Sequence, residues 1–188
     1  MHSAAPRRTD TGTSPLVLLR GAVAGGSAAA AVTTAFLLLL RAIGLSSLNL
    51  ELLLGSALTR SVDGAAWLAG FGVHLSFGVL FALLYGAILQ AARRQGAVAG
   101  AALGVVHALV SGFSLPIVLG LHPLIVSGVL ANPGFFARNL GLREVAVFLL
   151  AHIVYGAVVG ALVRPRRILP VEPDTEPLPR RRPLVGRR

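Results

Sequence analysis

The sequence has no cysteine and no lysine, and its single methionine is Met1. The missing cysteines exclude disulfides, thiolate metal sites and cysteine nucleophiles, and the lack of an internal methionine leaves no thioether ligand for copper. Only 13% of the 188 residues are charged, about half the fraction usual in soluble domains, whereas 55% are hydrophobic. This composition excludes an ordinary soluble fold.

The few charges are mostly positive and lie almost entirely outside the apolar runs. Seventeen basic residues against seven acidic ones give a formal charge of +10. In an apolar chain such an excess sets the orientation in the membrane and attracts anionic lipid head groups. We therefore expect the lipid bilayer as partner, with C-terminal arginines on anionic head groups, and no nucleic-acid binding, because no basic folded face remains. A homo-oligomer is compatible with the same composition.

Four apolar runs have the length of about 20 residues that one bilayer crossing requires. The predicted fold is an all-α, polytopic membrane protein, with four transmembrane helices in two hairpins and interfacial or re-entrant segments on the outer side. Residues 16–163 form this domain, between a disordered N-terminus (1–15) and a disordered Pro/Arg-rich tail (164–188). The predicted crossings are residues 21–40, 64–89, 96–115 and 145–163.

Two segments between the crossings are too short or too interrupted to span the bilayer. Residues 46–60 place Glu51 opposite a leucine face, which predicts an amphipathic helix that covers the surface. Pro116 is expected to bend or end the third crossing, and in residues 116–137 only 124–131 remains as an uninterrupted helix. Asp63 is expected to cap the second crossing, and Tyr85 to lie at the membrane interface.

The distribution of arginines predicts the topology. Thirteen arginines lie on the side of the two termini and the second-to-third connection, and four lie on the opposite side. The positive-inside rule then places both termini in the cytoplasm. We expect a multi-pass protein of the bacterial cytoplasmic (inner) membrane.

Small residues recur at every fourth position of the crossings, which lets membrane helices approach closely. The second crossing carries Gly70, His74, Gly78, Ala82 and Gly86 on one ridge, and the fourth carries Gly156 and Gly160. A histidine between glycines faces protein rather than lipid. These ridges therefore predict the contacts between helices.

Three histidines lie at a similar depth, about 10 to 15 Å from the outer helix ends at 1.5 Å per residue. They are His74, His107 and His152, one on each of the last three crossings. Imidazole in hydrocarbon requires partners and often marks a ligand site or pathway, and the Tyr155 hydroxyl requires a partner for the same reason. The three histidines and Tyr155 are thus compatible with one buried polar cluster.

Several functions fit this cluster. The histidines either only pack helices in a structural or scaffold protein, or form a proton or small-solute pathway, or bind a metal, haem or small apolar ligand. As a metal site the ligands would be His74, His107 and His152. As a cofactor site it would use His74 and His152 as a facing pair with Tyr155, and Gly78 and Gly156 would leave room for a planar ring. An enzyme is the least expected, because no nucleophile or phosphate-binding motif is present.

The chain resembles a family of small four-crossing bacterial membrane proteins known only as a domain of unknown function, over about residues 16–163. The resemblance rests on the runs LNLELLLGSALT, GFGVHLSFGVLFALLYG, GVVHALVSG, LHPLI, PGFF and AHIVYGAVVGAL. It implies the four-helix fold and supplies no activity. The positions that match the family pattern are His74, His107, His122, Pro123, His152, Tyr155 and Gly156.

Overall fold

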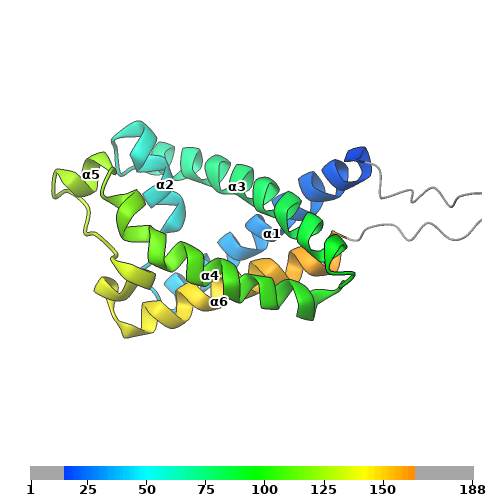
Figure 1. Ribbon diagram of the computed structural model, residues 1–188. Coiled ribbons are helices and arrows are strands. Elements are labelled where there is room, and N and C mark those ends of the chain that lie inside the picture. The colour runs from blue at the N-terminus through cyan, green and yellow to red at the C-terminus, as the bar shows by residue number, and fades with distance from the viewer. Residues whose placement is uncertain (1–14, 164–188) are drawn as a thin grey trace, which may run out of the picture.

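The computed structural model describes residues 15–163, which are helical with no strand in that range. Short helices and loops connect four long helices (Figure 1). The predictions for residues 1–14 and 164–188, including lipid contact by the tail arginines, lie outside the described residues. The elements are α1 (Pro15–Ala42), α2 (Leu50–Thr59), α3 (Gly64–Ala91), α4 (Ala97–Leu119), α5 (Pro123–Val126), the 3-10 helix η1 (Phe135–Leu140) and α6 (Leu142–Leu162).

The helices α1, α3, α4 and α6 are each long and apolar enough to cross a membrane. Their outer surfaces carry large apolar side chains, such as Val98, Val110 and Ile117, which are 85%, 64% and 74% exposed. Such a surface suits hydrocarbon, where exposed apolar side chains carry no hydration cost. The chain is therefore a multi-pass membrane protein, and the predicted all-α fold with four transmembrane helices is confirmed.

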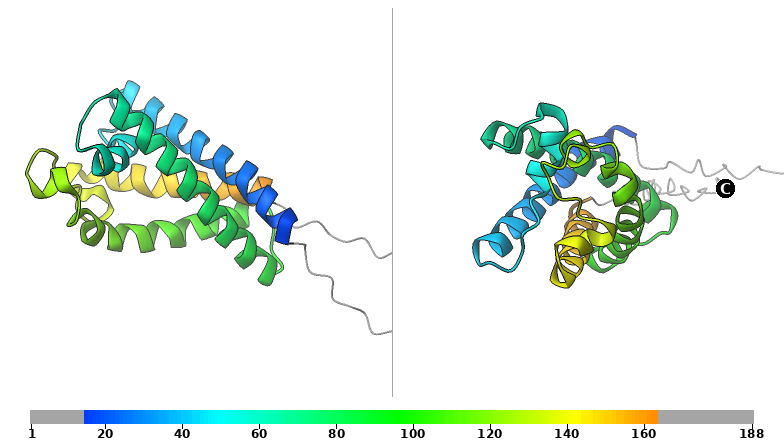
Figure 2. Two further views of the ribbon diagram at one scale, coloured as in Figure 1. Left: turned by 90° about the horizontal axis from the view of Figure 1, so that it is seen from above. Right: turned by 90° about the vertical axis from the view of Figure 1, so that its left-hand side faces the viewer.

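The long helices form two hairpins, α1 with α3 and α4 with α6. The described chain begins and ends at the same end of the bundle, and α2, α5 and η1 gather at the other end (Figures 1 and 2). The turn at residues 92–96 joins α3 to α4, whose backbones then diverge (Figure 2). Side chains still join the two helices, since the rings of Phe81 and His107 have centroids 4.0 Å apart.

Glycines allow α4 and α6 to pack backbone against backbone. A Cβ atom on Gly100 or on Gly156 would overlap the other glycine's carbonyl oxygen, and one on Gly160 would overlap the carbonyl of Gly96. The Gly96 N–H also donates to the Gly160 carbonyl at 3.2 Å. The predicted contact through Gly156 and Gly160 is confirmed.

The glycine ridge of α3 serves two neighbours. At Gly70 an added Cβ would overlap the backbone of Glu51 and Gly55 in α2, and at Gly78 it would meet Gly26 and Ala30 of α1. Because these contacts are with backbone atoms or a short side chain, nothing can move aside for a larger residue. The ridge predicted from Gly70 to Gly78 therefore fixes both α1 and α2 on α3.

Local predictions have mixed outcomes. Asp63 caps α3 as predicted, since its side chain accepts the Ala66 N–H at 2.9 Å. Pro116 was expected to bend or end the third crossing, and it does not end it: α4 continues to Leu119, because one more turn closes when the Pro116 carbonyl accepts the Gly120 N–H. The helix expected over 124–131 is also wrong, since α5 ends at Val126 and Gly128 has a φ of +77°.

Candidate functional site

A cavity of about 300 Å³ lies inside the half of the bundle that carries α2, α5 and η1. Its walls come from α1, α2, α3, α4 and α6 and are almost entirely apolar, with few polar side chains. Its volume is at the lower end of the range for small-molecule sites, about 300 to 1,000 Å³. The polar or titratable side chains that line it are Thr33, His74, His107, Ser111, His152 and Tyr155.

Side chains of α3 and α4, whose backbones diverge in this half of the bundle (Figure 2), form part of the cavity wall. Phe77 of α3 lines the cavity and is 45% exposed. From α4, the side chains of His107, Ser111 and Leu115 line it.

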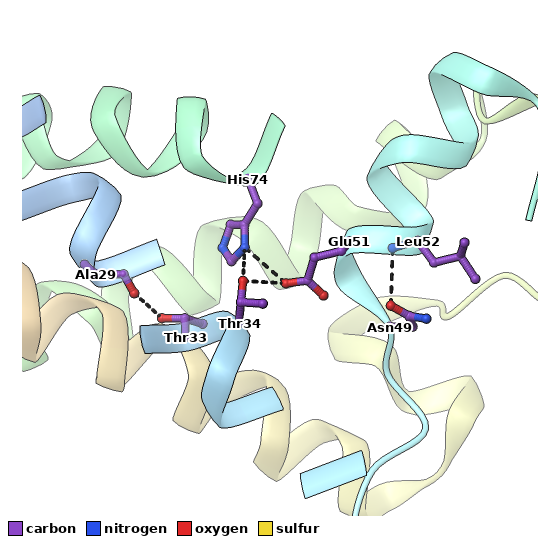
Figure 3. Close-up of polar contacts among 7 residues, drawn as sticks. All are labelled: Ala29, Thr33, Thr34, Asn49, Glu51, Leu52 and His74. Carbon is purple, nitrogen blue, oxygen red and sulfur yellow. Dashed lines mark hydrogen bonds and ion pairs between the residues drawn. The ribbon is translucent and has the colours of Figure 1, made fainter. Parts of the chain in front are cut away.

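His74 belongs to a buried cluster that joins three helices. Its Nδ1 lies 3.0 Å from Oγ1 of Thr34 in α1 and 3.3 Å from Oε1 of Glu51 in α2 (Figure 3). The Thr34 hydroxyl donates to the same Glu51 oxygen at 2.6 Å. Because the only hydroxyl proton of Thr34 goes to Glu51, Nδ1 of His74 must carry a proton and donate it to Thr34 and Glu51.

Glu51 is 1% exposed, yet its contacts favour the ionised form. Burial acts to raise the pKa of this carboxyl, but the hydrogen bonds from His74 and Thr34 outweigh burial and hold the pKa below its usual range. The surface-cover role predicted for residues 46–60 is therefore wrong at Glu51. Its polar face points into the protein, because the bundle interior holds the hydrogen-bond partners.

His107 and His152 face each other from α4 and α6. Their ring centroids are 4.8 Å apart with the planes nearly perpendicular. Nδ1 of His152 lies 2.8 Å from the Phe148 carbonyl, which can only accept, so this Nδ1 carries a proton. The Tyr85 hydroxyl lies 3.3 Å from Nδ1 of His107, and it donates there because it has no other acceptor within residues 15–163.

Tyr85 and Tyr155 pack next to His107. The Tyr155 hydroxyl donates to the Gly78 carbonyl at 2.6 Å, which is the partner that its depth in the membrane required. Tyr85 is 3% exposed and packs edge-on against Tyr155, with ring centroids 5.7 Å apart. The interfacial position predicted for Tyr85 is therefore wrong, because its hydroxyl finds His107 in the core.

The three cavity histidines share one pattern of hydrogen bonding. Each uses Nδ1 for a protein partner, and the Nε2 of each has no partner within the described residues. No fully buried side-chain nitrogen or oxygen in that range is left unpaired, so these Nε2 atoms are accessible. In the neutral rings, Nε2 of His74 and His152 accepts a hydrogen bond and Nε2 of His107 donates one.

His122 differs, although it also matches the pattern of the resembled family. Its Nδ1 accepts the Leu124 N–H at 3.2 Å and its Nε2 donates to the Leu53 carbonyl at 2.9 Å. Both nitrogens are thus satisfied by protein, and His122 joins α5 to α2. This histidine has a structural role, which makes it a control for the other three.

The structure places the predicted site residues in one region but changes how they pair. His74, His107, His152, Tyr155 and Gly78 all line the cavity. Within residues 15–163 the rings of His74 and His152 make no direct contact, because the His152 ring contacts His107 and Nδ1 of His74 is held by Glu51 and Thr34. Their pairing across a ligand stays a prediction.

The glycines do not leave room for a planar ring. The space beside Gly78 is filled by α1 and the space beside Gly156 by the backbone of α4. Within residues 15–163 no group of three or more histidine, aspartate or glutamate side chains is arranged to hold a metal ion. The expected haem pocket beside the glycines is therefore not formed, and the three-histidine set is not assembled as metal ligands.

A second buried carboxylate was also missed from the sequence. Glu144 of α6 is 1% exposed and accepts hydrogen bonds from the Ser46 hydroxyl at 2.6 Å and the Ser47 N–H at 2.6 Å. It does not line the cavity, and it ties the loop after α1 to the start of α6. The available signal was that Glu51, Asp63 and Glu144 are the three acids on the side opposite the termini, and that Asp63 is accounted for as a helix cap.

Comparisons with protein-family models, with curated proteins and with solved structures give no match for this chain. The resemblance to the four-crossing family therefore stays a prediction.

Proposed function

We propose that this membrane protein binds a small, lipid-soluble molecule with a hydroxyl group in the cavity between α3 and α4. The observation that carries the proposal is that His74, His107 and His152 all line one apolar cavity with Nε2 atoms that no described residue satisfies. Apolar walls with a few polar groups are typical of small-molecule sites. A hydroxyl both donates and accepts, which matches two accepting nitrogens and one donating nitrogen.

We further infer that the ligand enters from the bilayer between α3 and α4. Phe77 of α3 lines the cavity and is 45% exposed, and the backbones of α3 and α4 make few contacts. A purely structural role for the histidines accounts for His122, which bonds through both nitrogens. It does not account for three histidines that line one cavity and whose Nε2 atoms no described residue satisfies.

Imidazole ¹⁵N NMR of the detergent-solubilised protein tests the proposal. The probe is a nitrophenol with an alkyl chain, called here the nitrophenol probe. We expect it to bind and to shift the Nε2 signals of the cavity histidines His74, His107 and His152, because hydrogen bonding changes their environment. The signals of His122 should not move, because both of its nitrogens are already bonded to protein. A lack of binding, or binding that leaves the three cavity signals unchanged, would contradict the proposal.

We also propose that the protein lies in the bacterial cytoplasmic membrane with both termini in the cytoplasm. The thirteen-to-four division of arginines supports this orientation, together with the return of the described chain to one end of the bundle (Figure 2). The chain has no cysteine, so single cysteines at the exposed positions Val62, Ala92 and Arg138 can be labelled cleanly. An impermeant reagent outside the cell should label positions 62 and 138, and should not label position 92. If only position 92 were labelled from outside, the termini would lie outside the cell and the proposed orientation would be wrong.

A further inference from the structure

We infer that His74 accepts the proton of the ligand's hydroxyl group, with Glu51 and Thr34 as positioning residues, so that the ligand is a weakly acidic hydroxyl compound such as a phenol or hydroquinone. This inference rests on the proposed function and specifies its ligand class. The neutral His74 ring has its proton on Nδ1, toward Glu51, and its free electron pair on Nε2. Figure 3 shows the second ring nitrogen turned away from Glu51 and Thr34.

The carboxylate is what distinguishes His74 from the other possible acceptor. A carboxylate on the Nδ1 side of a histidine fixes the tautomer and stabilises the imidazolium that forms when Nε2 takes a proton. Glu51 lies 3.3 Å from Nδ1 of His74, whereas Nδ1 of His152 faces the neutral Phe148 carbonyl. Protonation of His74 therefore creates an ion pair, and protonation of His152 would create an isolated buried charge.

The proton transfer is balanced within the site. The ligand's O–H bond breaks, its electron pair stays on the oxygen, and a new N–H bond forms at Nε2 of His74. The positive imidazolium is paired with Glu51, and the ligand oxyanion accepts a hydrogen bond from Nε2 of His107. The total charge of the cavity and its ligand is unchanged, and the reaction requires no further reactant.

Titratable groups approach His74 from three neighbouring helices. Glu51 faces it from α2, His107 lines the cavity from α4, and His152 and Tyr155 line it from α6; α1 contributes the hydroxyl of Thr34. The other buried carboxylate, Glu144, is held by Ser46 and Ser47 and does not line the cavity. Glu51 is thus the carboxylate that contacts a histidine of the cavity, and Glu144, which is equally buried but contacts no cavity histidine, provides a matched control.

The test measures the ionisation of the bound nitrophenol probe from the visible absorbance of its phenolate, and its occupancy by equilibrium dialysis. In the intact wild-type protein we expect the probe to ionise at a lower pH than it does in detergent micelles. Glu51→Gln keeps a side-chain oxygen for Thr34 and His74 but removes the charge. We expect the half-ionisation pH to rise by about one unit, a tenfold change in proton affinity, in this variant. Glu144→Gln should leave it at the wild-type value.

A second variant, Thr34→Val, and the occupancy measured by dialysis separate a loss of proton transfer from a loss of binding. Thr34→Val removes the hydroxyl that bridges His74 and Glu51, and it should shift the half-ionisation pH in the same direction. If Glu51→Gln weakens binding but leaves the ionisation of the bound probe unchanged, Glu51 is only structural and the inference is overturned. A wild-type protein that binds the probe as the neutral phenol overturns the inference and leaves the proposed function standing. A wild-type protein that binds no probe overturns both.

Discussion

Replacing Gly156 by leucine is expected to separate α4 from α6 and to destabilise the folded protein by about 3 kcal/mol or more, the upper end of the cost of overpacking. The Cβ position at Gly156 overlaps the carbonyl oxygen of Gly100, and Gly104 lies beside it. These are backbone atoms of a helix and cannot rotate away. In a membrane, the lost contact is not replaced by hydrophobic association, because lipid is as apolar as leucine.

The matched control for this variant is Gly72→Leu. Gly72 is also a helical glycine of a crossing, but no atom lies within 4 Å of its Cβ position. Both substitutions change helix propensity in the same way, so only the packing differs. Thermal unfolding in detergent, followed by size-exclusion chromatography, should show a large loss for Gly156→Leu and little change for Gly72→Leu. Equal stability of the two variants would show that the α4 and α6 backbones do not meet.

Much of the fold could be predicted from the sequence because the bilayer limits the possibilities. A run of about 20 apolar residues has few alternatives to a membrane-spanning helix, since every backbone polar group must be satisfied within the segment. The repeat of small residues then indicated which helix faces meet. The shared depth of His74, His107 and His152 followed from a rise of 1.5 Å per residue, and the structure places all three at one cavity.

The partners of these histidines could not be predicted in the same way. Depth along a helix does not fix the rotation of one helix against another, so the sequence did not distinguish a pair of His74 and His152 from the pair of His107 and His152. Glu51 was misplaced because an amphipathic helix was assumed to turn its charge toward water. In this protein the charge turns inward, where Thr34 and His74 satisfy it.

The local errors have different causes. Tyr85 lies near the end of its crossing, where tyrosine is common at the interface, but the rotation of α3 directs its ring to His107. Proline normally ends a helix, yet Pro116 is followed by one more turn of α4 because a missing N–H near the helix end disrupts only one hydrogen bond. For Tyr85 a contact between elements decided the outcome, and no pattern within one element encodes such a contact.

Filling the cavity while leaving its histidines in place tests the central claim most directly. Ser111 of α4 lines the cavity between α3 and α4, and the neighbouring Val110 is 64% exposed on the lipid-facing surface. Phenylalanine at position 111 would occupy the space of the ligand, whereas phenylalanine at position 110 would extend into lipid. The two variants therefore add the same side chain to the same helix turn at sites inside and outside the cavity.

The measurement is the dissociation constant of the nitrophenol probe, obtained by equilibrium dialysis for the wild-type protein, Ser111→Phe and Val110→Phe. We expect Ser111→Phe to weaken binding at least about tenfold, which corresponds to about 1.4 kcal/mol, and Val110→Phe to bind like the wild type. Equal affinity of Ser111→Phe and Val110→Phe would contradict the claim that the cavity between α3 and α4 is the binding site.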